Sequence, residues 1–251
     1  MSIAVVAYAM CDMIHEVLGH GVACALTPGV RALSLSTVAL QTSAESRFVA
    51  SAGSIANLAV GLVLLAVVAR RQRFGLTGYF LWLLATLNLL NGTGYLLFSS
   101  ILNMGDWAVV IEGAKPHWVW RTVMGVVGIA AYARSVKLSA NSLGGFVRGG
   151  HLALANVRRL VILAYLSGGL LLVAGAARNS ISPSLILTSG ASSGFGAMMG
   201  MLFIPGIVEG AVGGSAPGAP GLRASIRWAI AGALVAIFFI GVLGPGITLA
   251  R

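Results

Sequence analysis

Residues 2–26 read SIAVVAYAMCDMIHEVLGHGVACAL, a mostly apolar stretch long enough to form one membrane-spanning helix. Two of the six acidic residues and two of the four histidines of the chain lie in it: Asp12, His15, Glu16 and His20. Each ionisable group inside a membrane costs about 2.5–3.5 kcal/mol. Four such groups within nine positions therefore predict a functional site and not a packing role.

The whole chain has the composition of a membrane protein. Of its 251 residues, 58% are hydrophobic and 9% are charged, whereas a soluble domain has roughly 25% charged residues. Lys and Arg outnumber Asp and Glu by 16 to 6, which is typical of loops that face anionic lipid. No basic run is interleaved with aromatic residues, so nucleic acid is not an expected partner.

Seven apolar stretches are candidates for membrane spans: 2–26, 47–69, 76–101, 119–133, 159–177, 184–208 and 226–249. The expected fold is an all-α polytopic membrane protein with six to seven transmembrane helices. The sixth stretch is rich in Gly, Ala and Ser, so it is expected near the centre of the bundle. A flexible linker is expected at 209–222, and the loop Lys and Arg favour an inside N-terminus.

The segment RALSLSTVALQTS (31–43) lies between the first two spans, and its successive side chains fall on two alternating faces. Alternation of this kind predicts a short membrane-associated strand or β-hairpin, with an ordinary loop as the alternative. The two cysteines, Cys11 and Cys24, both fall in the first span and are expected to be buried free thiols. The first span has no basic region before it and no clear cleavage site, so we expect a retained helix.

The spacing of the two histidines in the first span is unusual. A zinc-binding H-E-x-x-H helix has its histidines four apart, but His15 and His20 are five apart and would diverge by about 140° in a regular helix. A π-bulge near Gly19 would bring both to one metal ion. In the alternative, the helix is regular and Asp12, Glu16 and His20 form a stripe that binds a metal or relays protons. We favour the bulge.

Three segments together resemble the site-2 protease family of intramembrane zinc metallopeptidases. HEVLGHGVACAL (15–26) is similar to the zinc helix of that family, here with H-E-x-x-x-H spacing. SAGSIANLAVGL (51–62) is similar to the next core helix, with Gly53 and Asn57 in matching places. LNLLNGTGYLLFSSILNMGDW (87–107) resembles the third core helix, which ends in an Asp-Gly motif; here Gly105 precedes Asp106.

The resemblance implies a set of metal ligands. His15, His20 and Asp106 would hold Zn²⁺, and Glu16 would be the catalytic base. The position of Asp12, three residues before His15, makes it a competing third ligand.

The resemblance also implies how a substrate would be bound. Asn57 and Asn88 would bind it or steady the oxyanion, and the alternative for each is an interhelical hydrogen bond. A helix break at Gly92 and Gly94 and an exposed strand edge would unwind and pair with the substrate.

The function expected from the resemblance is cleavage of a peptide bond in a membrane-embedded peptide or protein by zinc-activated water. Residues 1–110 would form the metallopeptidase core, and residues 111–251 would add transmembrane helices of unassigned role to one integrated membrane domain. The expected location is the lipid bilayer of a cell membrane, such as a bacterial inner membrane. Alternatives are a non-proteolytic or inactive protein of this fold, and a proton- or ion-coupled transporter that uses Asp12, Glu16 and His20. Transporters commonly contain repeats, and the sequence has no convincing one.

Overall fold

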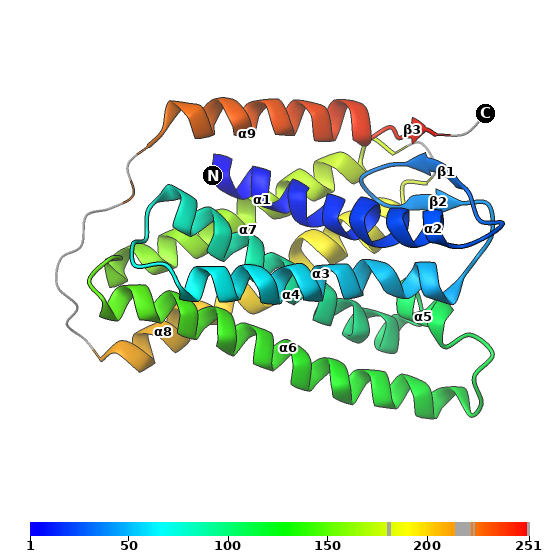
Figure 1. The fold of residues 1–251 in the computed structure, drawn as a ribbon, viewed down its shortest axis with the longest axis horizontal. Helices are drawn as coiled ribbons and strands as arrows, with labels where there is room; N and C mark the ends of the chain where they lie inside the picture. The colour runs from blue at the N-terminus through cyan, green and yellow to red at the C-terminus, as the bar shows by residue number, and fades with distance from the viewer. Residues whose placement is uncertain (180–181, 214–221, 223, 250–251) are drawn as a thin grey trace.

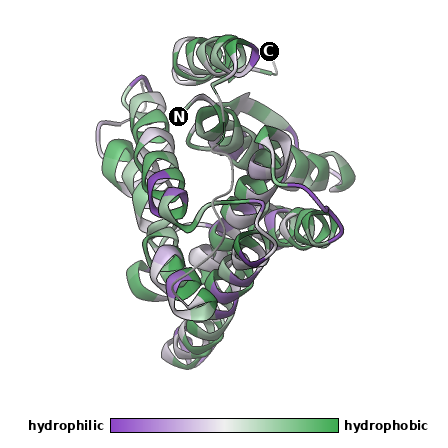
Figure 2. Cartoon of the chain, turned by 90° about the vertical axis from the view of Figure 1, so that its left-hand side faces the viewer, coloured by the Kyte–Doolittle hydropathy of each residue, from purple (hydrophilic) through white to green (hydrophobic). Residues whose placement is uncertain are grey.

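The protein is a bundle of long apolar helices. The computed structural model describes residues 1–179, 182–213, 222 and 224–249. These ranges contain seven helices long and apolar enough to cross a membrane (Figure 1): Ser2–Leu26, Arg47–Ala69 (α3), Leu76–Leu102 (α4), His117–Arg148 (α6), Leu154–Ala176 (α7), Ile186–Val212 and Ile226–Leu243. Their ribbons are mostly hydrophobic along their length (Figure 2). The prediction of an all-α polytopic membrane protein is confirmed at this level.

Three of the seven spans are composite. The first consists of α1 (Ser2–Met13), η1 (Ile14–Gly21) and α2 (Val22–Leu26). The sixth consists of η2 (Ile186–Gly196), η3 (Met199–Phe203) and α8 (Ile204–Val212), and the last of α9 (Ile226–Phe238) and η4 (Phe239–Leu243). A short helix, α5 (Asp106–Val110), lies between α4 and α6. Most of the linker expected at 209–222 falls on residues 214–221, outside the described residues.

The most buried span is α4, not the sixth span. Within the apolar window of each helix, 72% of α4 is buried, against 33% of Ile186–Val212. The prediction that the small residues place the sixth span at the centre is wrong. Its glycines instead allow close contact with neighbouring helices. A Cβ on Gly190 would lie 2.6 Å from Cβ of Ala176 on α7, and one on Gly200 would lie 2.7 Å from Cγ2 of Val136 on α6.

Helix α4 runs through both glycines at which the sequence predicted a break. Gly92 and Gly94 are helical, so that prediction is wrong. A Cβ on Gly92 would lie 2.8 Å from the carbonyl oxygen of Ser54, and one on Gly94 would lie 3.2 Å from Cβ of Ala197. Both glycines therefore let neighbouring helices approach α4, as small residues do in membrane bundles.

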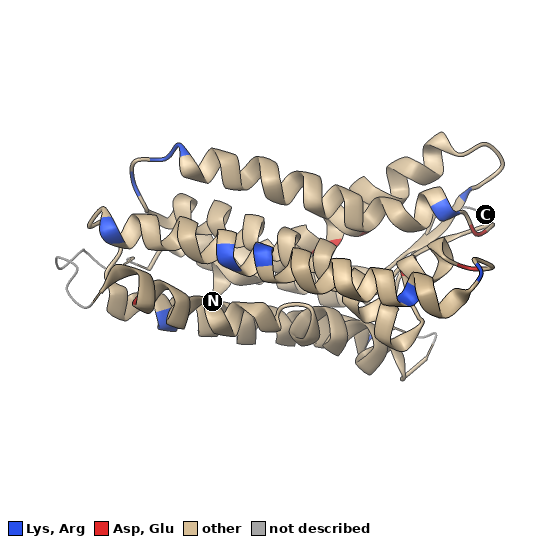
Figure 3. Cartoon of the chain, turned by 90° about the horizontal axis from the view of Figure 1, so that it is seen from below, with Lys and Arg blue, Asp and Glu red and all other residues tan. Residues whose placement is uncertain are grey.

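Helix α6 is far longer than the stretch 119–133 that hydropathy predicts. It continues to Arg148 because its later charged residues lie on one exposed side, while Ser135 and Val136 stay buried. Arg134 and Lys137 are three apart and exposed, and basic residues are visible along α6 in Figure 3. Hydropathy averages over all sides of a helix, so it missed the continuation.

A small antiparallel sheet follows the first span. Strands β1 (Ala32–Leu35) and β2 (Leu40–Thr42) form a hairpin, and β3 (Ile247–Thr248) pairs with the other side of β1. The strand order is β2-β1-β3, so β2 is an edge strand. The predicted hairpin is confirmed, and Figure 1 shows it beside α2.

Candidate metal centre

The segment that carries both histidines is a π-helix. Residues Ile14–Gly21 form η1, which interrupts the α-helical first span. Hydrogen bonds from i to i+5 add about one residue to each turn, so residues five apart come to nearly the same side. The rings of His15 and His20 meet edge to face with centroids 4.7 Å apart. The π-distorted geometry is thus confirmed, and the regular helix with its polar stripe is not observed.

Two glycines allow this segment to press against α3. A Cβ on Gly19 would lie 2.5 Å from Cα of Gly53. A Cβ on Gly53 would lie 2.6 Å from Nε2 of His20 and 2.7 Å from Nε2 of His15. Gly53 therefore provides the space in which both imidazoles sit, which no larger residue could do without moving them.

A tight turn after α4 delivers the carboxylate. Helix α4 ends at Leu102, Asn103 follows as its C-cap in the left-handed conformation (φ 53°), and Gly105 has φ +77°. Glycine adopts a positive φ without a steric penalty, and Asp106 then begins α5. In this sequence Gly105 precedes Asp106, whereas the family that the sequence resembles has Asp before Gly. The tight turn requires a glycine at position 105, which accounts for this order.

Each histidine has its Nδ1 bound to an acceptor on α3. Nδ1 of His20 lies 2.7 Å from the carbonyl oxygen of Val49, which can only accept, so Nδ1 carries the proton. Nδ1 of His15 lies 2.7 Å from Oδ1 of Asn57. The amide nitrogen of Asn57 donates to the carbonyl of Cys11 and to Oδ1 of Asn88, which identifies Oδ1 as the acceptor. Neutral forms of both rings therefore present an unprotonated Nε2.

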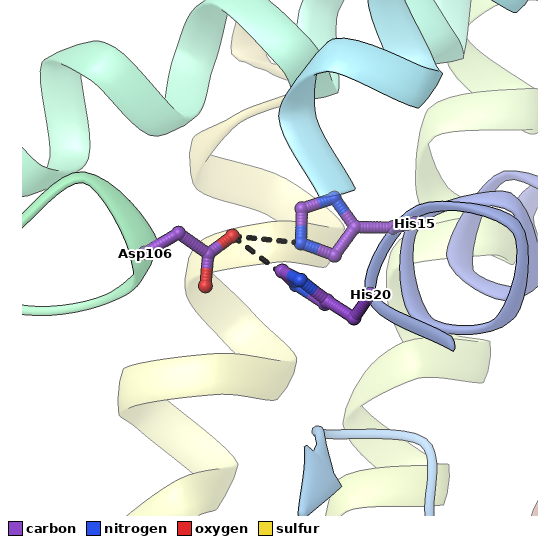
Figure 4. A group of neighbouring side chains, drawn as sticks. All are labelled: His15, His20 and Asp106. Atoms are coloured by element: carbon purple, nitrogen blue, oxygen red, sulfur yellow. Dashed lines mark hydrogen bonds and ion pairs between the residues drawn. The ribbon is translucent and has the colours of Figure 1, made fainter. Parts of the chain in front are cut away.

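Both Nε2 atoms point at the same carboxylate oxygen. Oδ2 of Asp106 lies 3.0 Å from Nε2 of His15 and 3.4 Å from Nε2 of His20 (Figure 4). Two ligands about 2.1 Å from a tetrahedral zinc ion are about 3.4 Å apart. Lone pairs converging at this distance repel each other unless protons or a cation lie between them. Among the described residues, His15, His20 and Asp106 form a group that could hold a metal ion.

Asp106 is ionised in this setting. Burial raises the pKa of its carboxyl, but the hydrogen bonds and positive charges of His15 and His20, whose rings are protonated when no cation is bound, outweigh burial, so the pKa lies below its usual range. A bound cation would take the place of those ring protons. A metal ligand must be deprotonated, and Asp106 meets that condition at neutral pH.

A cavity of about 330 Å³ opens onto this group. Its lining includes His20, Asp106 and Glu16, together with the edge strand β2. Oε2 of Glu16 accepts a hydrogen bond of 2.6 Å from the backbone nitrogen of Leu40. Glu16 thus shares a cavity with two of the three converging side chains, His20 and Asp106. Its carboxylate is bonded to the backbone of the edge strand β2.

The two asparagines predicted to bind substrate lie inside the bundle. Asn57 and Asn88 are both 0% exposed, and their amides bond to each other at 2.8 Å. Asn88 also donates to the carbonyl of Leu84. The interhelical hydrogen bond given as the alternative is present, and substrate contact stays a prediction without support from this geometry.

Asn57 orients His15, and removing it is expected to weaken metal binding. Asn57→Ala leaves Nδ1 of His15 without its acceptor, and loss of such a partner costs about 10- to 100-fold in metal affinity. Competition with a chelator on purified protein measures this change. Asn141→Ala, at an exposed position of α6, is the matched control and should bind like the wild type. Equal affinities in the two variants would contradict the orienting role.

The contacts of several other residues near the centre are known only from the structure. The ring of Tyr95 stacks on His15 with centroids 4.6 Å apart, and nothing in the sequence distinguished it from a core aromatic. Asp12, the competing ligand, is not in the converging group; its Oδ2 is buried without a hydrogen-bond partner. The free thiols Cys11 and Cys24 are buried, as predicted.

The fold and the centre define a class: a helical membrane protein with a buried group of two histidines and one carboxylate that could hold a metal ion. Compared with known proteins, the chain matches no protein-family model, no curated protein and no solved structure. The resemblance to the site-2 protease family therefore stays a prediction from the sequence motifs.

Proposed function

We propose that the chain is an intramembrane zinc metalloprotease that hydrolyses a peptide bond of a membrane-embedded substrate. The observation that carries the proposal is the convergence of three lone pairs, on Nε2 of His15, Nε2 of His20 and Oδ2 of Asp106, inside an apolar helix bundle. Three protein ligands and an open position are the usual arrangement of catalytic zinc. The cavity beside His20 and Asp106 would leave room for a water molecule at that open position.

The residues of the cavity divide the reaction between them. Zinc held here would supply a water molecule of lowered pKa as the nucleophile. Glu16 would accept the proton of that water as its oxygen attacks the carbonyl carbon, and would pass the proton to the nitrogen as the C–N bond breaks. The Leu40 nitrogen, which bonds to Oε2 of Glu16, would hold the carboxylate in place.

The edge strand β2 would align the substrate. Val38, Ala39, Leu40 and Thr42 line the cavity, and β2 has a neighbour on one side only. An extended peptide can pair with such an edge through backbone hydrogen bonds, which also exposes its peptide bonds to attack.

Metal analysis of the purified protein tests the proposal. We expect one zinc ion per chain and a loss of zinc in His15→Ala, because two ligands hold zinc far more weakly than three. A control variant, His151→Ala, removes a histidine remote from the centre and should keep the metal. Two histidines and one carboxylate also suit non-haem iron. Stoichiometric iron in place of zinc, or no metal at all, would overturn the proposal.

A further inference from the structure

A second, apolar pocket lies directly beside the metal cavity. It has a volume of about 350 Å³ and is lined from α4 by Leu97, Phe98 and Ile101 and from η3 by Met199 and Phe203. A volume of this size lies within the range of small-ligand sites. Ile101 and Phe203 are 69% and 62% exposed, so the pocket reaches the lipid-facing surface of the bundle.

The two cavities share part of their lining. Tyr95, Phe98 and Thr188 line both the apolar pocket and the cavity that contains His20 and Asp106. Tyr95 also stacks on His15, so the wall of the apolar pocket is in contact with the metal-binding group. A ligand with its reacting bond at the metal would have its next apolar group at this pocket.

The lining of the pocket includes the junction in the sixth span at which η2 ends and η3 begins. The hydroxyl of Tyr132 donates to the carbonyl of Ala197 at 2.6 Å and accepts from the nitrogen of Gly200 at 2.7 Å. These bonds satisfy the backbone where η2 gives way to η3. Gly196 has no side chain at this point, and a Cβ there would meet nothing closer than 4.0 Å.

The polar groups of the lining are already paired. The hydroxyl of Ser192 donates to the carbonyl of Thr188 at 2.6 Å, and Ser193 bonds to Tyr95. A ligand that is polar here would find few free partners, whereas an apolar group would lose nothing on entry.

We infer that this pocket is the specificity subsite of the metal centre and binds a large apolar side chain next to the bond that is hydrolysed. The inference rests on the proposed function and extends it to the choice of substrate. The pocket would select segments that have a long or aromatic apolar residue next to the hydrolysed bond. It also gives η2 and η3, which lie outside the three segments that resemble the protease family, a role in substrate choice.

Alkyl hydroxamates test the subsite without requiring a known substrate. The hydroxamate group chelates the metal, and the alkyl chain extends from it. Acetohydroxamate and octanohydroxamate are titrated against zinc-loaded protein in lipid nanodiscs, for the wild type and for Gly196→Leu, which fills the pocket. We expect Gly196→Leu to weaken octanohydroxamate binding about tenfold or more, since each displaced methylene is worth about fourfold. Acetohydroxamate should bind both proteins alike.

Controls separate this inference from the metal centre. Gly145→Leu adds the same side chain on α6, at a glycine with open space around it, and should leave both titrations unchanged. Acetohydroxamate binding with no effect of Gly196→Leu on the longer chain would overturn the subsite alone. No binding of either probe to the wild type would overturn the metal centre. Native mass spectrometry also shows whether a lipid copurifies with each protein. If the wild type carries a lipid that Gly196→Leu lacks, and both proteins bind the probes equally, the pocket is a lipid site and not a substrate subsite.

Discussion

Glu16→Gln is expected to lower hydrolysis by about 10²- to 10⁴-fold while the metal content stays that of the wild type. Glutamine keeps the size of the side chain, and its amide oxygen can still accept from the nitrogen of Leu40. It cannot take a proton from the attacking water. The measurement is cleavage of a model transmembrane peptide in vesicles, followed by mass spectrometry, with metal analysis of the same samples.

Glu45 offers a matched control for this experiment. It lines the same cavity as Glu16, but it is exposed and is not a member of the converging group. Glu45→Gln should cleave the model peptide at close to the wild-type rate. A Glu16→Gln protein that keeps its metal and still cleaves would show that another group is the base. Loss of cleavage in Glu45→Gln alone would move that role to Glu45.

The membrane spans and the distorted first span were predictable because each rests on local sequence. Hydropathy over about 20 residues identifies a span whatever surrounds it. The five-residue separation of His15 and His20, with Gly19 between them, was a local conflict that one extra residue in a helical turn resolves. The alternation at 31–43 similarly predicted the hairpin, because side-chain direction in a strand depends on neighbours in sequence.

The features that the sequence did not reveal depend on contacts between distant segments. Tyr95 is part of the centre because its ring, on α4, stacks on His15 of η1, and small residues of η2 line two cavities together with residues of α4. The sequence allows Asn57 either to bind substrate or to form an interhelical hydrogen bond, and the buried Asn57 bonds to His15. A residue type and a spacing cannot show whether an amide faces a cavity or another helix.

Gly53→Ala is expected to disable the metal centre while the helix bundle stays intact. The added methyl carbon would lie 2.6 Å from Nε2 of His20 and 2.7 Å from Nε2 of His15, well inside van der Waals contact. Both imidazoles must move, and Nδ1 of His20 would be pulled from the carbonyl of Val49. Displacing both ligands and one supporting bond is expected to weaken zinc binding by at least about 100-fold, as measured by chelator competition.

The same helix supplies the control that distinguishes this effect from general loss of packing. A Cβ on Gly61 would lie 2.8 Å from Cγ of Leu89, so Gly61→Ala disturbs the contact between α3 and α4 about as severely, but away from the histidines. Both variants should lower the free energy of unfolding by roughly 1–3 kcal/mol, as expected for an overpacked site. Gly61→Ala should keep its zinc and Gly53→Ala should lose it. If both bind zinc like the wild type, the imidazoles do not sit against Gly53; if both lose zinc, the centre depends on helix packing as a whole and not on the space that this one glycine provides.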